Sequence, residues 1–337
     1  MRVDGLLLLD KPAGLSSNAA LQRARRLFDA SRAGHGGTLD PLASGLLPVM
    51  FGEACKLAEA SLAGDKGYLA TVRLGVRTST DDREGEVLEV REPLLDGRPI
   101  DRAAIDRALA AFRGPIVQVP PVFSALKVGG VPMYKRARRG ETLVPEPRRV
   151  TIHSLEIDAW HSPDLVVRIR CSKGTYVRAL ARDLGVALGC GAHLAELRRT
   201  RVGRFDLDAA IGLDALGALD PAARDARLVT PASLVDGWPR VDLDPASAAR
   251  FVHGQAVPIP AASLREAAGR PDAEPHQDPG AAVPDGATRR IAVFAAGSLI
   301  GLAANPPAPL SDSAAERASA TAGSPTCLLV PSRIIAA

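Results

Sequence analysis

The loop at residues 34–41, Gly-His-Gly-Gly-Thr-Leu-Asp-Pro, offers the clearest chemistry in the chain. It holds one carboxylate, Asp40, among glycines, a histidine and a threonine. A following proline biases Asp40 away from the right-handed helical region, and the glycines allow a close approach of the backbone to a ligand. An ordinary glycine-rich turn has a similar composition. The uncharged run over 41–52 favours instead a loop that is anchored in the core and presents a carboxylate.

Other ligand-binding patterns do not fit this loop. It lacks the Gly-Lys-Ser/Thr ending of a phosphate-binding P-loop, and its glycine spacing is not that of a dinucleotide-binding fingerprint. His35 and Asp40 are the only potential metal ligands nearby, and no second His or Cys stands at ligand spacing. A metal site is therefore a weak interpretation.

Strands, hairpins and helices must position this loop. Ser16, Ser17 or Asn18 is expected to cap the first helix, and Asp101 a later one. Strands are predicted over 5–9, 46–51, 68–74, 149–159 and 165–171, helices over 18–28, 53–62, 101–112 and 173–188, and a polar turn over 78–86. Because the strands and helices do not alternate regularly, the pattern predicts an α+β fold rather than a doubly wound sheet.

The C-terminal third has a different composition. Short strands are predicted within 240–258, 290–302 and 327–335, and two Ala/Pro/Asp-rich stretches, 261–288 and 303–324, separate them. These stretches have little to bury and are expected to be disordered or loosely ordered loops. We expect two domains, residues 1–238 and 239–337, with the stretches interrupting the second.

The composition predicts a cytoplasmic globular protein. Hydrophobic residues make up 46% of the 337 residues, but no uninterrupted apolar run approaches the roughly 18 residues of a membrane span. The N-terminus lacks a signal-peptide layout. The four cysteines are scattered without a Cys-x-x-Cys pair, so buried free thiols are expected rather than metal ligands or disulfides.

Basic residues gather in clusters, although the net charge is only +4. The clusters are Lys135, Arg136, Arg138 and Arg139; Arg148 and Arg149; and Arg198, Arg199, Arg201 and Arg204. Any one of them is compatible with a solvated face. Several clusters that converge on one surface favour contacts to RNA phosphates.

Six blocks of the chain, over roughly its first two thirds, resemble the TruB family of pseudouridine synthases. The blocks are 10–17 (Asp-Lys-Pro-Ala-Gly-Leu-Ser-Ser), 34–41, 67–68, 120–127 with Gly130 and Tyr134, 171–178 (Cys-Ser-Lys-Gly-Thr-Tyr-Val-Arg) and 191–199. Together, and in this order, they are far more specific than any single motif. The resemblance implies a mixed, mainly antiparallel sheet in the catalytic domain, followed by a small β-barrel-like PUA domain.

The resemblance also assigns catalytic roles. It implies that Asp40 is the nucleophile and that Arg178 lies against it, a cation that keeps the carboxylate ionised. Taken without the motif, Arg178 is compatible with the polar face of a helix, and Tyr68 with core packing in a strand. The family pattern instead has Tyr68 stack on the target base, with its hydroxyl assisting proton transfer at C5. Attack at uracil C6, attack at ribose C1′ and elimination through a glycal all stay open.

The resemblance places four further residues near the substrate. Tyr176 and Leu197 match residues that bound the uracil pocket, and His35 matches a histidine that contacts the RNA loop. Lys11, with Pro12, is expected to shape and support the active-site loop on the substrate side.

The expected activity is conversion of uridine to pseudouridine at position 55 in the T-loop of tRNA. Such an isomerisation needs no cofactor and no metal, and the expected partner is the T-arm stem-loop of tRNA. We expect a monomer without a membrane or a required protein partner. The nearest alternative is an RNA-guided relative that modifies ribosomal RNA inside a ribonucleoprotein, and another is an RNA-folding or RNA-binding protein without catalysis.

Overall fold

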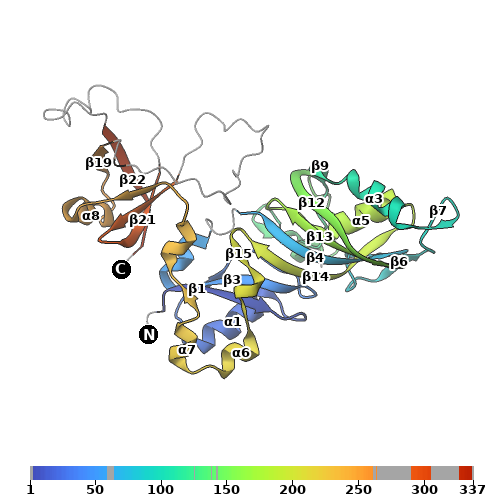
Figure 1. Ribbon diagram of the computed structural model, residues 1–337, viewed down its shortest axis with the longest axis horizontal. Coiled ribbons are helices and arrows are strands. Elements are labelled where there is room, and N and C mark those ends of the chain that lie inside the picture. The colour runs from blue at the N-terminus through green and yellow to red at the C-terminus, as the bar shows by residue number, and fades with distance from the viewer. Residues whose placement is uncertain are drawn as a thin grey trace. The chain divides into compact units, whose positions relative to one another are not determined.

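The computed structural model describes residues 3–58, 64–124, 126–137, 139–141, 143–260, 263, 290–304 and 326–335. The chain forms two compact units (Figure 1). Residues 7–49 and 61–227 form the first unit, and residues 2–6, 50–60 and 228–337 form the second. Each unit has its own core of buried apolar side chains.

A mixed sheet organises the first unit. Its strands run in the order β16 (Ile211–Gly212), β1 (Gly5–Lys11), β3 (Ser44–Phe51), β14 (Ala192–Val202), β4 (Lys66–Leu74), β13 (Asp164–Cys171), β12 (Arg148–His161) and β9 (Gly114–Gln118). The pairs β1–β16 and β3–β14 are parallel, whereas β14–β4, β4–β13, β13–β12 and β12–β9 are antiparallel. The prediction of an α+β fold with a mainly antiparallel sheet is therefore confirmed.

Helices α1 and α3 of the first unit begin where the sequence signals them. The Ser16 hydroxyl accepts a hydrogen bond from Ala19 N (3.1 Å) and caps α1 (Ser17–Leu27). The Asp101 carboxylate accepts from Ala104 N (2.7 Å) and caps α3 (Arg102–Ala110). Capping side chains of this kind satisfy backbone donors that have no partner inside the helix. Helix α5 (Val177–Ala187) starts slightly later than predicted and ends beside Leu188, as predicted.

Helices α3 and α5 cover one face of the sheet (Figure 1). Leu184 of α5 and Ile105 of α3 are almost fully buried there, as are Val72 of β4 and Leu155 of β12. Burying one such side chain contributes about 1.5–3 kcal/mol relative to leaving it exposed. This core fixes α5 against β14 and β4, the strands that carry the predicted site residues.

Short elements complete the first unit. They are β2 (Ala33–His35), β5 (Val76–Thr78), β6 (Val87–Val90), β7 (Leu94–Leu95), β8 (Arg98–Pro99), β10 (Lys127–Val128), β11 (Val131–Pro132), α4 (Met133–Ala137), β15 (Phe205–Asp206), η2 (Leu207–Ala209), α6 (Leu213–Ala218) and α7 (Pro221–Asp225).

The second unit contains a five-stranded sheet. Its order is β18 (Arg240–Asp242), β20 (Arg290–Ala295), β21 (Ser298–Ala304), β22 (Thr326–Ile334) and β19 (Val257–Pro260), accompanied by η1 (Gly52–Leu57), β17 (Leu228–Val229), η3 (Pro231–Val235) and α8 (Pro245–Val252). Val241, Phe251 and Val293 are fully buried in its core. The first two residues of the loop predicted over 303–324 instead form the end of β21. The rest of the predicted loops, 261–288 and 305–324, lies outside the described residues, apart from residue 263.

Two predictions of local structure are wrong. The segment 240–258 holds the helix α8 between two short strands, because the Asp244 carboxylate accepts from two backbone amides and Pro245 occupies the first helical turn. The first part of the helix predicted over 53–62 is instead the 3₁₀ helix η1, which ends at Leu57, and residue 58 is α-helical. Asp4 accepts from Glu53 N (2.6 Å) at the start of η1, and such tight turns are used in short pieces. Residues 59–62 of that prediction lie outside the described part.

The cysteine side chains that the structure describes are free thiols, as the sequence predicted. Cys171 and Cys190 are buried free thiols, and Cys55 is a half-buried one. Among the helices that the structure describes, none combines the length and the apolar character needed to cross a membrane.

Candidate active site

The loop that carries Asp40 connects β2 to β3 and is held on both sides of the carboxylate. The buried Ser17 hydroxyl accepts from Leu39 N (2.7 Å) and donates to Leu39 O (2.9 Å). On the other side, Gly14 N donates to Pro41 O (2.8 Å). The uncharged strand β3 that follows is almost completely buried, as the sequence predicted. The loop is therefore fixed in place and presents Asp40 from a rigid frame.

Arg178 lies against Asp40. Its Nε stands 2.9 Å from Asp40 Oδ2, and its Nη1 stands 3.5 Å from Asp82 Oδ2. The side chains of Arg178 and Asp82 are each only 5% exposed, whereas Asp40 keeps 36% of its side-chain surface exposed. Arg178 also donates to Thr80 O (3.1 Å) and Phe123 O (2.9 Å). One buried guanidinium thus joins the carboxylate to two neighbouring loops, and Asp40 is the member of the cluster that solvent can reach.

The charges around Asp40 act on its pKa in opposite directions. Burial raises the pKa of Asp40, and the Arg178 cation opposes that rise. The Asp82 carboxylate raises the pKa further, and the Lys11 ammonium lowers it. Since the net effect is a raised pKa, Asp40 becomes protonated at a higher pH than an ordinary aspartate does.

A change at Arg178 is expected to alter the pH dependence of activity. Arg178→Met removes the main charge that lowers the pKa of Asp40, so the acid limb of the kcat–pH profile should move to higher pH. Arg178→Lys keeps a charge and should move it less. The measurement is the single-turnover rate of RNA modification across pH, with the surface variant Arg73→Met as control. An acid limb that stays in place in Arg178→Met would show that this limb does not report Asp40.

Tyr68 and Arg199 are direct cross-strand neighbours on β4 and β14. Tyr68 is 9% exposed and Arg199 is 1% exposed. Burial raises the pKa of Tyr68 to about 12, and the Arg199 charge opposes the rise. The Asp40 carboxylate also raises this pKa. The phenol therefore lies within electrostatic reach of the carboxylate and stays protonated at neutral pH.

Leu197 and Tyr176 lie on elements that adjoin these groups. Leu197 is paired with Ala70 on β4, two residues along from Tyr68, and is 8% exposed. Tyr176 precedes α5, where its backbone amide donates to the Gln118 side chain (3.1 Å). The Arg148 guanidinium lies 5.6 Å from the Tyr176 ring centroid.

Lys11 is less accessible than a substrate contact usually is, whereas His35 is half-buried. Lys11 is completely buried and donates to Pro12 O (2.9 Å) and Leu15 O (2.6 Å). Burial lowers the pKa of Lys11 to about 8, although the Asp40 charge acts in the opposite direction. Burial and the Arg199 charge lower the pKa of His35, which favours the neutral ring at neutral pH. His35 Nδ1 is buried and has no hydrogen-bond partner among the described residues.

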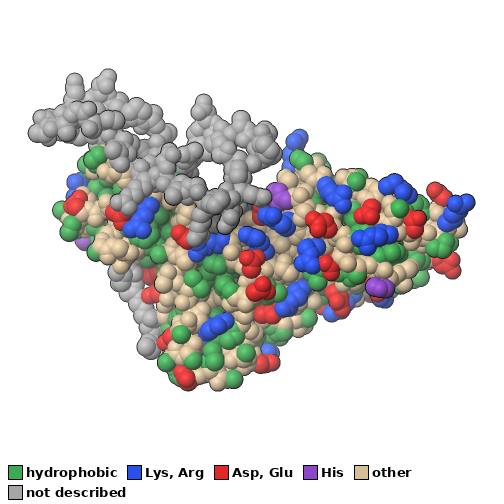
Figure 2. Space-filling view, in the orientation of Figure 1, with side chains coloured by type: hydrophobic (Ala, Val, Ile, Leu, Met, Phe, Trp, Pro, Cys, Tyr) green, Lys and Arg blue, Asp and Glu red, His purple; other side chains and the backbone are tan. Residues whose placement is uncertain are grey.

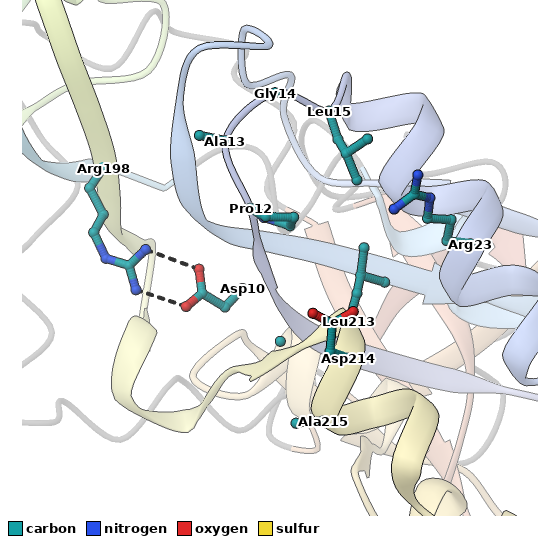
Figure 3. Close-up of a pocket in the computed structure, with 11 residues that line it drawn as sticks. Asp10, Pro12, Ala13, Gly14, Leu15, Arg23, Arg198, Leu213, Asp214 and Ala215 are labelled. Carbon is teal, nitrogen blue, oxygen red and sulfur yellow. Dashed lines mark hydrogen bonds and ion pairs between the residues drawn. The ribbon is translucent and has the colours of Figure 1, made fainter.

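The arginines of β14 do not all fit the predicted phosphate contacts. Arg199 is wrong for that role, because its side chain points into the protein and is buried. Arg198 pairs with both oxygens of Asp10, at 2.7 and 3.2 Å (Figure 3). Arg201 Nε lies 3.8 Å from Asp206 Oδ1. On the face that Figure 2 shows, basic and acidic side chains are interspersed rather than separated.

A surface cavity of about 550 Å³ lies beside the candidate site rather than at it. Figure 3 shows Arg198 and Asp10 on one side of this cavity and Arg23 of α1 on the other. Neither Asp40 nor Tyr68 lines it. Within the part of the chain that the structure describes, no three His, Cys, Asp or Glu side chains are grouped as metal ligands would be.

Two residues of the site were not predicted. Asp82 lies in a polar turn with several acidic residues, and the sequence alone does not show which of them approaches Arg178. The fold brings Asp82 to that position. Arg199 stands among surface-like arginines, but β-strand alternation puts it on the same face as Leu197 and the opposite face from Arg198. That alternation was the available signal for a buried arginine.

Comparisons with known proteins show the family of this chain. The TruB family pseudouridylate synthase N-terminal domain matches residues 25–177, and the tRNA pseudouridylate synthase B C-terminal domain matches residues 178–231. The chain is 55% identical over 271 residues to tRNA pseudouridine synthase B of Burkholderia mallei (strain NCTC 10247), covering 80% of this chain and 86% of that protein. It is 50% identical over 258 residues to the protein of the same name from Azoarcus sp. (strain BH72), covering 77% and 84%.

Solved structures share the fold. The crystal structure of a Cbf5–Nop10–Gar1 complex contains a chain that matches with a TM-score of 0.67 at 24% identity, covering 98% of this chain and 84% of that one. At this identity the match shows only that the two chains share a fold. With the two family domains and the relatives at 50–55% identity, it follows that this chain belongs to the TruB family of pseudouridylate synthases.

Proposed function

We propose that this protein converts the uridine at position 55 of the tRNA T-loop into pseudouridine. The observation that carries the proposal is the Asp40–Arg178 pair, 2.9 Å apart, in a chain whose relatives are tRNA pseudouridine synthases. The reaction breaks the bond from uracil N1 to ribose C1′ and forms a bond from C5 to C1′. The hydrogen on C5 leaves to solvent and N1 gains a proton, so the two nucleosides are isomers.

Asp40 is the nucleophile in this proposal. A carboxylate can form a covalent intermediate and divide one difficult step into two easier ones. Arg178 supports this role, because its charge favours the ionised carboxylate in a site from which the substrate excludes water. Asp82 in turn holds the second edge of Arg178 and keeps its Nε directed at Asp40.

Tyr68, Leu197 and Tyr176 receive the base. Extracting a nucleotide from its stack costs a few kcal/mol, and stacking on an aromatic ring returns about 1–3 kcal/mol per base. Tyr68 supplies that ring and directs its hydroxyl toward C5, while Leu197 and Tyr176 bound the uracil. His35 contacts the RNA loop, and the buried Lys11 supports the segment that hydrogen-bonds to Pro41.

The C-terminal residues form a separate RNA-binding domain in this proposal. We assign residues 1–238 to the catalytic domain and residues 239–337 to a PUA-like domain that the stretches 261–288 and 303–324 interrupt. The five-stranded sheet of the second unit supports this assignment. The enzyme then acts on tRNA as a cytoplasmic monomer, without an obligatory protein or guide RNA.

A T-arm stem-loop alone should be a good substrate. RNA is recognised chiefly through loops and splayed bases, because side chains cannot read the deep major groove of an RNA duplex. We expect kcat/KM on an isolated T-arm hairpin to lie within about tenfold of that on whole tRNA, a difference of at most ~1.4 kcal/mol. Tritium release from RNA labelled at uridine C5 measures this directly. The affinity should fall steadily with salt, since bound counterions are released on binding.

A hairpin with a substituted target uridine is the matched control. If the T-arm is inert and ribosomal RNA with a guide is modified, the RNA-guided alternative replaces this proposal. Binding of tRNA without tritium release from any substrate would support the non-catalytic RNA-folding alternative instead.

A further inference from the structure

Arg199 is the largest side chain that the first unit buries completely. Its Nε donates to Leu46 O (2.7 Å), and its two terminal nitrogens donate to Gly37 O (3.1 Å) and Thr38 O (3.4 Å). Tyr68, the residue paired with Arg199 on β4, lies within electrostatic reach of the guanidinium. Arg199 therefore contacts the backbone two and three residues before Asp40 and the strand that follows the Asp40 loop, and it is the cross-strand neighbour of Tyr68.

The neighbours of Arg199 leave its charge uncompensated. Among the described residues it forms no ion pair, and Tyr68 is the group that favours its charged form. Lys11, His35 and Lys66 are near enough for the Arg199 charge to lower the pKa of each. Burying a charge without an opposite charge beside it costs free energy. A buried guanidinium without an acidic partner therefore indicates that Arg199 has a role other than stabilising the fold.

Strand β3 approaches the backbone of Arg199 closely at a glycine. Gly45 of β3 is paired with Arg199 and has a φ of +101°. A Cβ at that position would lie 2.3 Å from Arg199 O, so only glycine fits. The register of β14 against β4 shifts between Arg199 and Arg201, which is a bulge directly beside the residue. Bulges of this kind redirect a side chain, and they occur often next to active sites.

We propose that Arg199 is the positioning residue that fixes the Asp40 loop and the Tyr68 hydroxyl relative to each other, without touching the substrate. This inference rests on the roles proposed above for Asp40 and Tyr68. In this proposal Tyr68 Oη accepts a hydrogen bond from the guanidinium, because an arginine side chain only donates. The hydroxyl hydrogen of Tyr68 would then point toward another acceptor.

The planar guanidinium suits this task better than a lysine does. Its five N–H donors stand in a rigid fork and can serve several acceptors at once. One rigid group thereby links β3, β4 and the catalytic loop. Reacting groups lose rate when they are misplaced by about 1 Å, so loosening this link should lower turnover without preventing RNA binding.

The main experiment compares Arg199→Met and Arg199→Lys with wild type in single-turnover assays on tRNA. We expect Arg199→Met to fold, to bind tRNA within a few-fold of wild type, and to lose about 10²–10³ in kcat, as on removal of one preorganised donor. Arg199→Lys keeps the charge but not the planar set of N–H donors, so its kcat should lie between those of wild type and Arg199→Met. The acid limb of the pH profile should stay in place, in contrast to Arg178→Met. The matched control is Arg73→Met, an exposed arginine on β4 that pairs with Asp164.

A double-mutant cycle tests the link to Tyr68. If Arg199 acts partly through the phenol, Arg199→Met should cost at least about tenfold less in a Tyr68→Phe background than in wild type. Equal losses in both backgrounds would contradict that link. Wild-type kcat in Arg199→Met would overturn the inference, and if that variant does not fold, wild-type kcat in Arg199→Lys would do the same.

A readout that does not depend on activity separates this inference from the proposed function. Arg199→Met removes donors to two carbonyls of the loop, so amide hydrogen exchange over residues 36–43 should accelerate while exchange over α5 is unchanged. Unchanged exchange over 36–43 would overturn the positioning role even if tRNA is the substrate. Accelerated exchange in a protein that modifies no tRNA would refute the proposed function and leave the positioning role intact.

Discussion

We expect Asp40→Asn to abolish pseudouridine formation, with a loss of order 10⁴-fold or more, as when a nucleophile is removed from other enzymes. Asparagine keeps the volume and one oxygen acceptor of aspartate, so the loop clamped at Leu39 and Pro41 should keep its shape. It carries no charge and cannot form the covalent intermediate. Tritium release from tRNA measures turnover, and filter binding should give a Kd within a few-fold of wild type.

The matched control for this variant is Asp164→Asn. Asp164 also pairs with an arginine, Arg73, at 2.6 Å, but on the surface and away from Asp40. Its loss should leave turnover unchanged, because exposed ion pairs contribute only about 0–1 kcal/mol to stability. Substantial residual turnover in Asp40→Asn would remove Asp40 from the nucleophile role and move attention to the remaining carboxylate of the cluster, Asp82.

Much of the fold could be predicted because burial leaves a clear pattern in the sequence. Strands such as β3 and β13 are continuous or alternating apolar runs, and Ser16 and Asp101 are strong capping signals. Helix α8 was missed because its eight residues lie between two short strands, although Asp244 and Pro245 form the start signal of a helix. A start signal for so short a helix is easily outweighed by the strand patterns on either side of it.

The candidate site was only partly predictable, since it depends on contacts between distant segments. Asp40 and Arg178 could be paired through their motifs, and the structure places them 2.9 Å apart. Asp82 is close to Arg178 only because the fold brings its turn to α5. Arg199 was interpreted as a phosphate contact because composition does not distinguish a buried arginine from a solvated one.

Tyr68→Phe is expected to lower turnover by about 10²–10⁴, the usual contribution of a positioned acid or base. The variant keeps the aromatic face, so tRNA binding should stay within a few-fold of wild type. If Tyr68 Oη accepts a hydrogen bond from Arg199, as proposed above, loss of the phenol oxygen leaves a buried donor unsatisfied and should lower the free energy of unfolding by about 1–3 kcal/mol. Single-turnover rates, Kd and urea denaturation report these three effects separately.

Tyr68→Ala distinguishes stacking from proton transfer. Removal of the ring should weaken binding by about 1–3 kcal/mol as well as stop turnover. If Tyr68→Phe turns over near the wild-type rate while Tyr68→Ala is inactive, the residue only stacks and another group moves the proton at C5. If the hydroxyl transfers the proton and Arg199 positions it, Arg199→Met should also slow the tyrosine enzyme at least about tenfold more than the phenylalanine enzyme. Agreement of these two series would assign the hydroxyl, and not the ring alone, to the chemical step.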